Sequence, residues 1–141
     1  MRVYLPATFS ALQVLLDSGS LDADVALAVT DELRDALPAA DEEELELEAM
    51  LDAAERSLAL VAADPSAVRR RLVLAADVPV VRPAPELGPA AVRLDGVVPL
   101  SAVVSGHVDE EGVEAQVDAG EVEDLALLWY AVQELGGLVG R

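Results

Sequence analysis

The chain has 141 residues, of which 53% are hydrophobic, and 27 Asp and Glu against 9 basic residues give a formal net charge of −18. The apolar content excludes an acidic disordered tail and predicts one globular domain over residues 1–141. A surface this acidic repels phosphates and anionic lipids and attracts basic proteins. We therefore expect no nucleic-acid or membrane partner, and a basic protein as the favoured partner.

The composition also bears on compartment and chemistry. Cysteine, lysine, isoleucine and asparagine are all absent, so disulfides and thiolate metal sites are excluded. Together with the lack of a secretory signal, this predicts a cytoplasmic protein. The glycines form neither a dinucleotide-binding nor a P-loop motif, so we expect no cofactor, and we expect no metal. The charge itself has two explanations, the background composition of a GC-rich or salt-adapted proteome and selection for a partner.

The first part of the chain alternates predicted strands and helices. Residues 2–5 predict a strand, and Thr8 caps the helix that follows. Residues 25–29 predict a second strand, and Thr30 caps a short helix that Pro38 closes. If these strands share a sheet with residues 72–76, right-handed crossovers make all three parallel.

A long amphipathic helix is predicted over residues 41–64. Asp41 and Glu44 have the spacing of a capping box, and acidic residues fill the first turn. The expected apolar stripe consists of Leu47, Met50, Leu51, Ala54, Leu58 and Val61.

The second half begins with Arg69-Arg70-Arg71, which we interpret as an internal ion-pair hub or a guard on a strand edge. A buried strand over 72–76 follows, and then a proline-rich connection over 78–89. Asp95-Gly96 predicts a hairpin turn between strands 91–94 and 97–100.

The last third of the chain predicts a strand, a loop and a helix. The strand covers residues 103–109, and the mobile acidic surface loop covers 110–120. The helix covers 122–135, with Trp129 in the core. Its broad apolar surface is also compatible with a homodimer. Together these elements predict an α/β fold, a mixed sheet of four to six strands covered by helices, with a two-layer α+β sandwich as the alternative.

Two kinds of site are candidates. In a parallel sheet, Thr8, Thr30 and Asp77 meet at the C-terminal edge, where Arg82 can reach them and bind a small ligand or substrate; the other interpretation is that they are caps and turn residues. The alternative function is therefore a small-ligand-binding protein or enzyme. The second candidate is a non-enzymatic acidic binding or regulatory module, which contacts its basic partner through the carboxylates of Glu42, Glu43, Glu44, Glu46, Asp109, Glu110 and Glu111.

His107 is the only histidine. On a strand it shares a face with Asp109 and Glu111, an arrangement that can bind a divalent cation, orient a general base or assist the ligand site. The other interpretation is a histidine at a strand end beside an acidic loop. Ser105 precedes it by two residues but has no nucleophile-elbow context.

Several short segments together resemble one family. They are Met1–Thr8, Ala28-Val29-Thr30, the long acidic helix, Leu74–Pro79 and His107-Val108-Asp109. The chain is similar over most of its length to an uncharacterised family of small acidic proteins from high-GC bacteria. The resemblance implies no activity and no catalytic residues.

Overall fold

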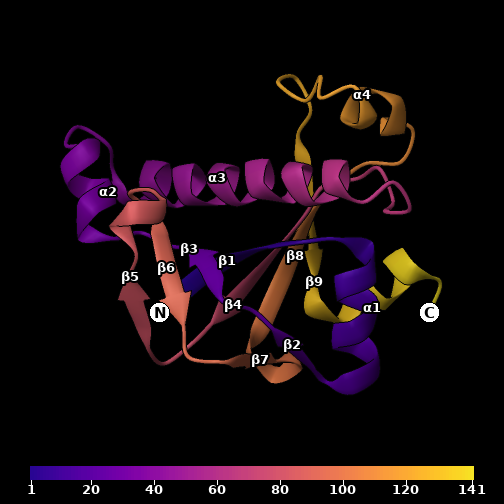
Figure 1. Ribbon diagram of the computed structural model, residues 1–141, viewed down its shortest axis with the longest axis horizontal. Coiled ribbons are helices and arrows are strands. Elements are labelled where there is room, and N and C mark those ends of the chain that lie inside the picture. The colour runs from indigo at the N-terminus through magenta and orange to yellow at the C-terminus, as the bar shows by residue number, and fades with distance from the viewer.

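The computed structural model describes residues 1–141 and centres on a seven-stranded antiparallel sheet (Figure 1). Across the sheet the strands run in the order β5 (Val81–Pro83), β6 (Ala91–Leu94), β3 (Val25–Leu27), β1 (Arg2–Ala7), β4 (Leu72–Asp77), β8 (Val103–Asp109) and β9 (Leu127–Ala131). A separate ribbon pairs β2 (Ser20–Asp22) with β7 (Val97–Pro99). The predicted combination of helices and strands is confirmed, but the sheet has more strands than expected and is not mixed.

The prediction of parallel strands was wrong. β1 pairs with β3 and with β4 in antiparallel register. The reason is the short strand β2, which the sequence did not reveal. After α1 (Phe9–Ser18), β2 carries the chain back to the end of β1, where Asp24 and Val25 line the same hollow as Thr8. β3 therefore enters the sheet from the end at which β1 leaves it.

The helix starts follow the predicted capping chemistry. The Thr8 hydroxyl accepts a hydrogen bond from the amide of Ala11 at the start of α1, and Thr30 does the same for α2 (Asp31–Ala36). Asp41 and Glu44 form the capping box of α3 (Glu42–Ala63). The remaining helices are short: α4 (Glu114–Asp118) and the 3₁₀ segments η1 (Pro85–Leu87), η2 (Leu100–Ala102) and η3 (Val132–Val139).

Helices cover both faces of the sheet (Figure 1). On one side, which we call the α1 face, residues from α1, the β2–β7 ribbon and η3 pack on the sheet. On the other side, the α3 face, α2 and α3 do so. Alternation along each strand divides the side chains between the two faces. In β4, for example, Leu72 and Leu74 lie on the α1 face, while Val73 and Ala75 lie on the α3 face.

The predicted stripe of α3 was only partly correct. Ala54 and Val61 are buried, but Leu47 and Leu51 are about half exposed. The buried positions recur every fourth residue and are mostly small: Leu45, Ala49, Ala53, Ser57 and Val61. Small side chains allow the helix backbone to approach the sheet closely, so the larger leucines are displaced to its flanks.

Three expectations for the second half of the chain were wrong. β6 and β7 belong to different sheets, so Asp95-Gly96 does not close a hairpin between them. The predicted mobile loop contains α4, whose Val117 packs with Val113 against Val61 of α3. The predicted C-terminal helix is replaced by β9 and η3. None of the helices is both long and apolar enough to span a membrane.

Candidate functional site

A groove opens on the α3 face where the helix stops covering the sheet. α3 contacts β1, β3 and β4, and β8 and β9 continue beyond it. The groove between helix and strands has a volume of about 250 Å³. We call it the α3–β9 groove, and its side chains of greatest chemical interest are Glu43, Glu46, Leu47, Met50, His107 and Trp129.

Trp129 forms one wall of this groove. It lies on the last strand of the sheet, directly opposite His107 in register, and is 63% exposed. Leu47 faces the groove from α3 and is itself 49% exposed. A large exposed aromatic residue beside an exposed leucine is typical of a binding surface. The indole face also attracts cations through its quadrupole.

His107 lies in the groove beside a buried serine. The Ser105 hydroxyl is 3.3 Å from the imidazole Nε2. Burial, followed by the positive charge of Arg2, lowers the pKa of His107, so the ring is neutral at physiological pH. No carboxylate is hydrogen-bonded to the ring, and Ser105 is in a strand rather than on an exposed turn. The pair therefore lacks the orienting acid of an acyl-transfer triad.

Arg2 is the one arginine on the lining of the groove, at its acidic end. Arg2 is engaged with Asp77, its Nε 2.7 Å from the Asp77 Oδ1. This hydrogen bond raises the pKa of Arg2 and lowers the pKa of Asp77. Glu43 and Glu46 take part in no ion pair.

Tyr4 also lies at this end of the groove. Burial first, and then the charge of Glu46, raise the pKa of its phenol. A cation that enters the groove would meet Glu43 and Glu46, which form no ion pair, beside an aromatic wall, with Arg2 on the same lining.

A second acidic hollow lies on the opposite side of the same sheet edge. It has a volume of about 520 Å³, and its lining includes Glu110, Glu111, Tyr130 and Glu134 together with Arg70, whose Nε donates to a backbone carbonyl. We call it the β9 hollow. Tyr130 follows Trp129 in β9 and so points to the α1 face. The two predicted acidic clusters thus flank β9 from opposite faces.

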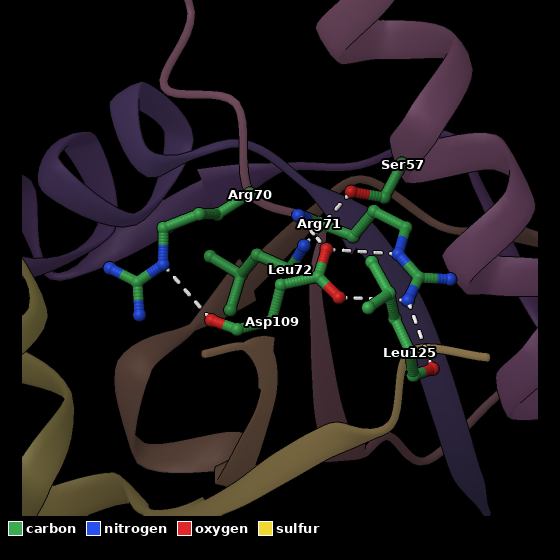
Figure 2. A network of polar contacts seen from close by, with 6 residues as sticks. All are labelled: Ser57, Arg70, Arg71, Leu72, Asp109 and Leu125. Atoms are coloured by element: carbon green, nitrogen blue, oxygen red, sulfur yellow. Dashed lines mark hydrogen bonds and ion pairs between the residues drawn. The ribbon is translucent and has the colours of Figure 1, made fainter. Parts of the chain in front are cut away.

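Asp109 does not belong to either acidic surface. It is completely buried and forms a two-point ion pair with Arg71, through distances of 2.8 and 2.9 Å (Figure 2). The backbone amide of Arg71 donates to the same carboxylate, and Arg70 Nε donates to the Asp109 carbonyl. The predicted internal ion pairing is therefore confirmed for Arg71 alone, since Arg69 pairs with the exposed Asp118 and Arg70 with a carbonyl. Asp109 as a partner-binding residue was wrong, because its carboxylate has no access to solvent.

Ser57 completes the buried polar contacts in Figure 2. Its hydroxyl donates to the Ala7 carbonyl at 2.7 Å and accepts from the Leu72 amide at 3.0 Å. The serine thus fixes α3 to the ends of β1 and β4.

The other acidic residues at the start of α3 have local partners. Glu42 forms an exposed ion pair with Arg34, and this hydrogen bond lowers the pKa of Glu42 and raises that of Arg34. Glu44 accepts from the Asp41 amide in the capping box. Among the predicted partner-binding residues, Glu43, Glu46, Glu110 and Glu111 are therefore those that line the hollows without such a role.

The candidate ligand residues are not brought together. Since β1 and β4 are antiparallel, Asp77 lies beside Arg2 at one end of the pair, while Thr8 lies beyond the other end. Thr30 donates to the Pro89 carbonyl, and Arg82 pairs with Asp95 on the far edge of the sheet. The expected grouping was wrong, and a ligand-binding role for any of these residues stays a prediction.

An apolar pocket of about 250 Å³ lies at the Asp77 end of the sheet, between Val80 and Val98. Its two carboxylates, Asp77 and Asp95, are each paired with an arginine. No group of three or more His, Asp or Glu side chains in the protein has the arrangement of a metal site. In particular, Asp109 faces Arg71, so the alignment of His107, Asp109 and Glu111 as cation ligands was wrong.

Sequence reasoning missed Trp129, the most exposed large apolar residue of the groove. Its helical spacing with Leu125, Val132 and Leu135 placed it in the core. The run Leu127–Ala131 also carries the signal of a strand, five apolar residues with two adjacent aromatics. Acidic residues before this run and Glu134 after it limit the predicted strand to a short segment.

The fold and the groove together define a small α/β protein with an antiparallel sheet and, at one sheet edge, a groove lined by acidic and aromatic side chains. The chain belongs to a family of unknown function, DUF6912, whose model matches residues 1–139. The predicted membership in a family without an assigned activity is thus confirmed. No curated protein and no solved structure matches the chain.

Proposed function

We propose that this protein is a non-enzymatic binding module that holds a basic segment of another protein at the β9 edge. The observation that carries the proposal is the exposed Trp129 beside the unpaired carboxylates of Glu43 and Glu46. No arginine or lysine occurs between Arg93 and Arg141, the part of the chain that supplies β8 and β9. The cysteine-free composition favours the cytoplasm as the compartment.

An arginine side chain of the partner would make two favourable contacts in the groove, one with the indole of Trp129 and one with a carboxylate. A guanidinium stacked on the indole gains about 0.5–2 kcal/mol, depending on how fully it is desolvated. The same group can donate to a carboxylate, and Arg suits both contacts better than Lys because it is planar and weakly hydrated. The neutral His107 adds no repulsion, and the charge of Arg2 is paired with Asp77. We therefore expect an arginine-containing segment to be preferred.

The test is a titration of the protein with a heptapeptide that alternates Arg and Val. Binding is monitored by tryptophan fluorescence. Trp129 is the only tryptophan, so the signal reports directly on the groove. We expect saturable binding that weakens with salt, and no binding of the matching Glu/Val peptide. Failure of the Arg/Val peptide to bind would overturn the proposal.

A charge-matched pair of variants separates the groove from the general acidity. Glu43→Gln with Glu46→Gln removes two charges from the groove. Glu48→Gln with Glu55→Gln removes two from exposed positions of α3 that do not line it. We expect the first pair to weaken binding about tenfold and the second less than twofold. Equal losses would show that only the overall charge acts.

A further inference from the structure

We infer that the basic segment binds as an additional β-strand, paired through its main chain with the free edge of β9. This inference rests on the proposed function and specifies how the partner is held. Strand addition uses backbone hydrogen bonds for affinity and alternate side chains for selectivity. Both requirements are met at this edge.

The hydrogen-bond pattern between β8 and β9 determines which backbone groups of β9 point outward, away from the sheet. In an antiparallel strand the N–H and C=O of one residue point to the same neighbour. The Asp109 amide donates to Arg71 beside β4, so Asp109 and His107 point toward β4, and Val108 and Gly106 point toward β9. Their partners Leu128 and Tyr130 therefore complete the β8 ladder.

The alternate residues of β9 consequently face away from the sheet. Leu127, Trp129 and Ala131 present their N–H and C=O groups at the open edge. Glu134 satisfies one of these groups by accepting from the Ala131 amide at 2.9 Å. The groups of Leu127 and Trp129 form the free part of the edge, since β9 is the last strand of the sheet.

The opposite edge of the sheet shows the protection that β9 lacks. β5 has three residues and ends at Pro83, and Pro79 and Pro85 flank it closely. Prolines and short length prevent edge pairing. β9 has five apolar residues with neither a proline nor a charge. An edge of this kind recruits another strand unless something covers it.

The charge of the surfaces on both sides of β9 indicates which kind of strand would bind at this edge. A strand added to β9 would place its alternate side chains beside the α3–β9 groove and the β9 hollow, and in each of them carboxylates outnumber a single arginine, Arg2 in the groove and Arg70 in the hollow. A basic segment complements both faces. A second copy of this chain would bring β9 flanked by Asp124 and Glu134 against the same residues, and such like charges repel each other. The structure therefore favours a basic strand over self-pairing.

The experiment is amide hydrogen exchange of the protein, measured by NMR with and without the Arg/Val heptapeptide at saturation. We expect the exchange of the Leu127 and Trp129 amides to slow at least tenfold, because a bound strand would accept from them. The Leu128 and Tyr130 amides already donate within the sheet and should change little. Binding that leaves Leu127 and Trp129 unprotected would overturn strand addition and leave the proposed function standing.

A matched pair of variants tests the same point by affinity. Leu127→Pro removes the outward N–H at the first position of the strand, where proline is tolerated, while Leu127→Ala keeps it. We expect the proline variant to bind the peptide at least tenfold more weakly than the alanine variant. Equal affinity of two folded variants would contradict the inference. If the proline variant does not fold, the exchange measurement decides alone.

Two other outcomes also bear on the inference. No binding of the peptide would overturn both the proposed function and the strand addition. A dimer in sedimentation without peptide, with Leu127 and Trp129 protected, would assign the edge to a second copy and overturn the basic-strand assignment.

Discussion

On the α1 face the buried cluster has 18 members, most of them large aliphatic side chains, and the buried Arg70 stacks on its Phe9 ring. On the α3 face the buried cluster has 12 members, many of them alanine, and polar groups lie buried beside it. Gly106 illustrates the density of the first face, since a Cβ there would lie 2.6 Å from a methyl carbon of Leu135. The second face instead ends in the α3–β9 groove.

The difference shows how a protein can keep an open groove beside its core. The α1 face supplies burial, which stabilises the fold in proportion to the apolar area removed from water. The α3 face uses close helix packing and buried hydrogen bonds, and these fix the helix position without covering β8 and β9. The carboxylates and Trp129 of the groove remain open because the helix lies close to the other strands.

The largest effect is expected where polar burial fixes the α3 face. Asp109→Ala leaves the guanidinium of Arg71 buried without its partner, and loss of one member of such a pair costs about 3–5 kcal/mol. Urea denaturation measures the loss. The double variant Arg71→Met with Asp109→Leu should recover most of it, because no buried charge remains. A loss below about 1 kcal/mol in the single variant would contradict this account of the pair.

The two faces should be destabilised by opposite changes of side-chain volume, the α1 face by removing volume and the α3 face by adding it. On the α1 face, Leu74→Ala deletes fully buried volume and should lower the free energy of unfolding by about 2–4 kcal/mol. On the α3 face, Ala53→Leu adds volume between helix and sheet and should cost about 1–3 kcal/mol. Ala59→Leu, at an exposed position of the same helix, is the control and should be nearly neutral. A tolerated Ala53→Leu would show that close approach of α3 is not required.

The smallest effect concerns the pH dependence of the groove. Burial and Arg2 lower the pKa of His107 in the folded protein, so the unfolded chain takes up this proton at higher pH. The contribution of the neutral ring to stability is present above the unfolded pKa of about 6.5 and is lost as the pH falls below it. The free energy of unfolding of the wild type should therefore fall relative to His107→Gln between about pH 7.5 and 5.5, by less than ~1.4 kcal/mol per pH unit.

The comparison with His107→Gln isolates this residue. Other groups that face the ring are Arg2 and Tyr4 from β1 and Glu43 and Glu46 from α3, and they are the same in both proteins. Parallel pH profiles of the two proteins, obtained by chemical denaturation, would contradict the lowered pKa.

Part of the fold could be predicted because its signals are local. Thr8, Thr30 and the Asp41–Glu44 pair cap helices through hydrogen bonds that span three residues, so their spacing in the sequence carries the information. The strands at β1, β3 and β4 were also found, since alternation and apolar runs are local. Pro6 lies in the central strand β1 and is tolerated there because β3 pairs with β1 only at Tyr4.

The candidate site was less predictable, since its residues come from segments distant in the sequence. Glu43 and Glu46 were named from the acidic helix, but nothing local indicates that Trp129 lies across the groove from them. Asp109 is an example of a residue whose sequence context suggested exposure but which the tertiary structure buries. It resembles its acidic neighbours Glu110 and Glu111 in the sequence, yet strand register places it against Arg71 and buries it completely.

The sequence by itself determined the acidic charge, the capped helices and most strand positions, because these depend on composition and on contacts within a few residues. Only the tertiary structure decided strand direction, the buried face of α3 and the exposure of Trp129. Those depend on β2 returning the chain to the end of β1 and on small residues bringing α3 close to the sheet. Long-range pairing of this kind is set by the packing of the whole chain, and local hydrophobic patterns do not specify it.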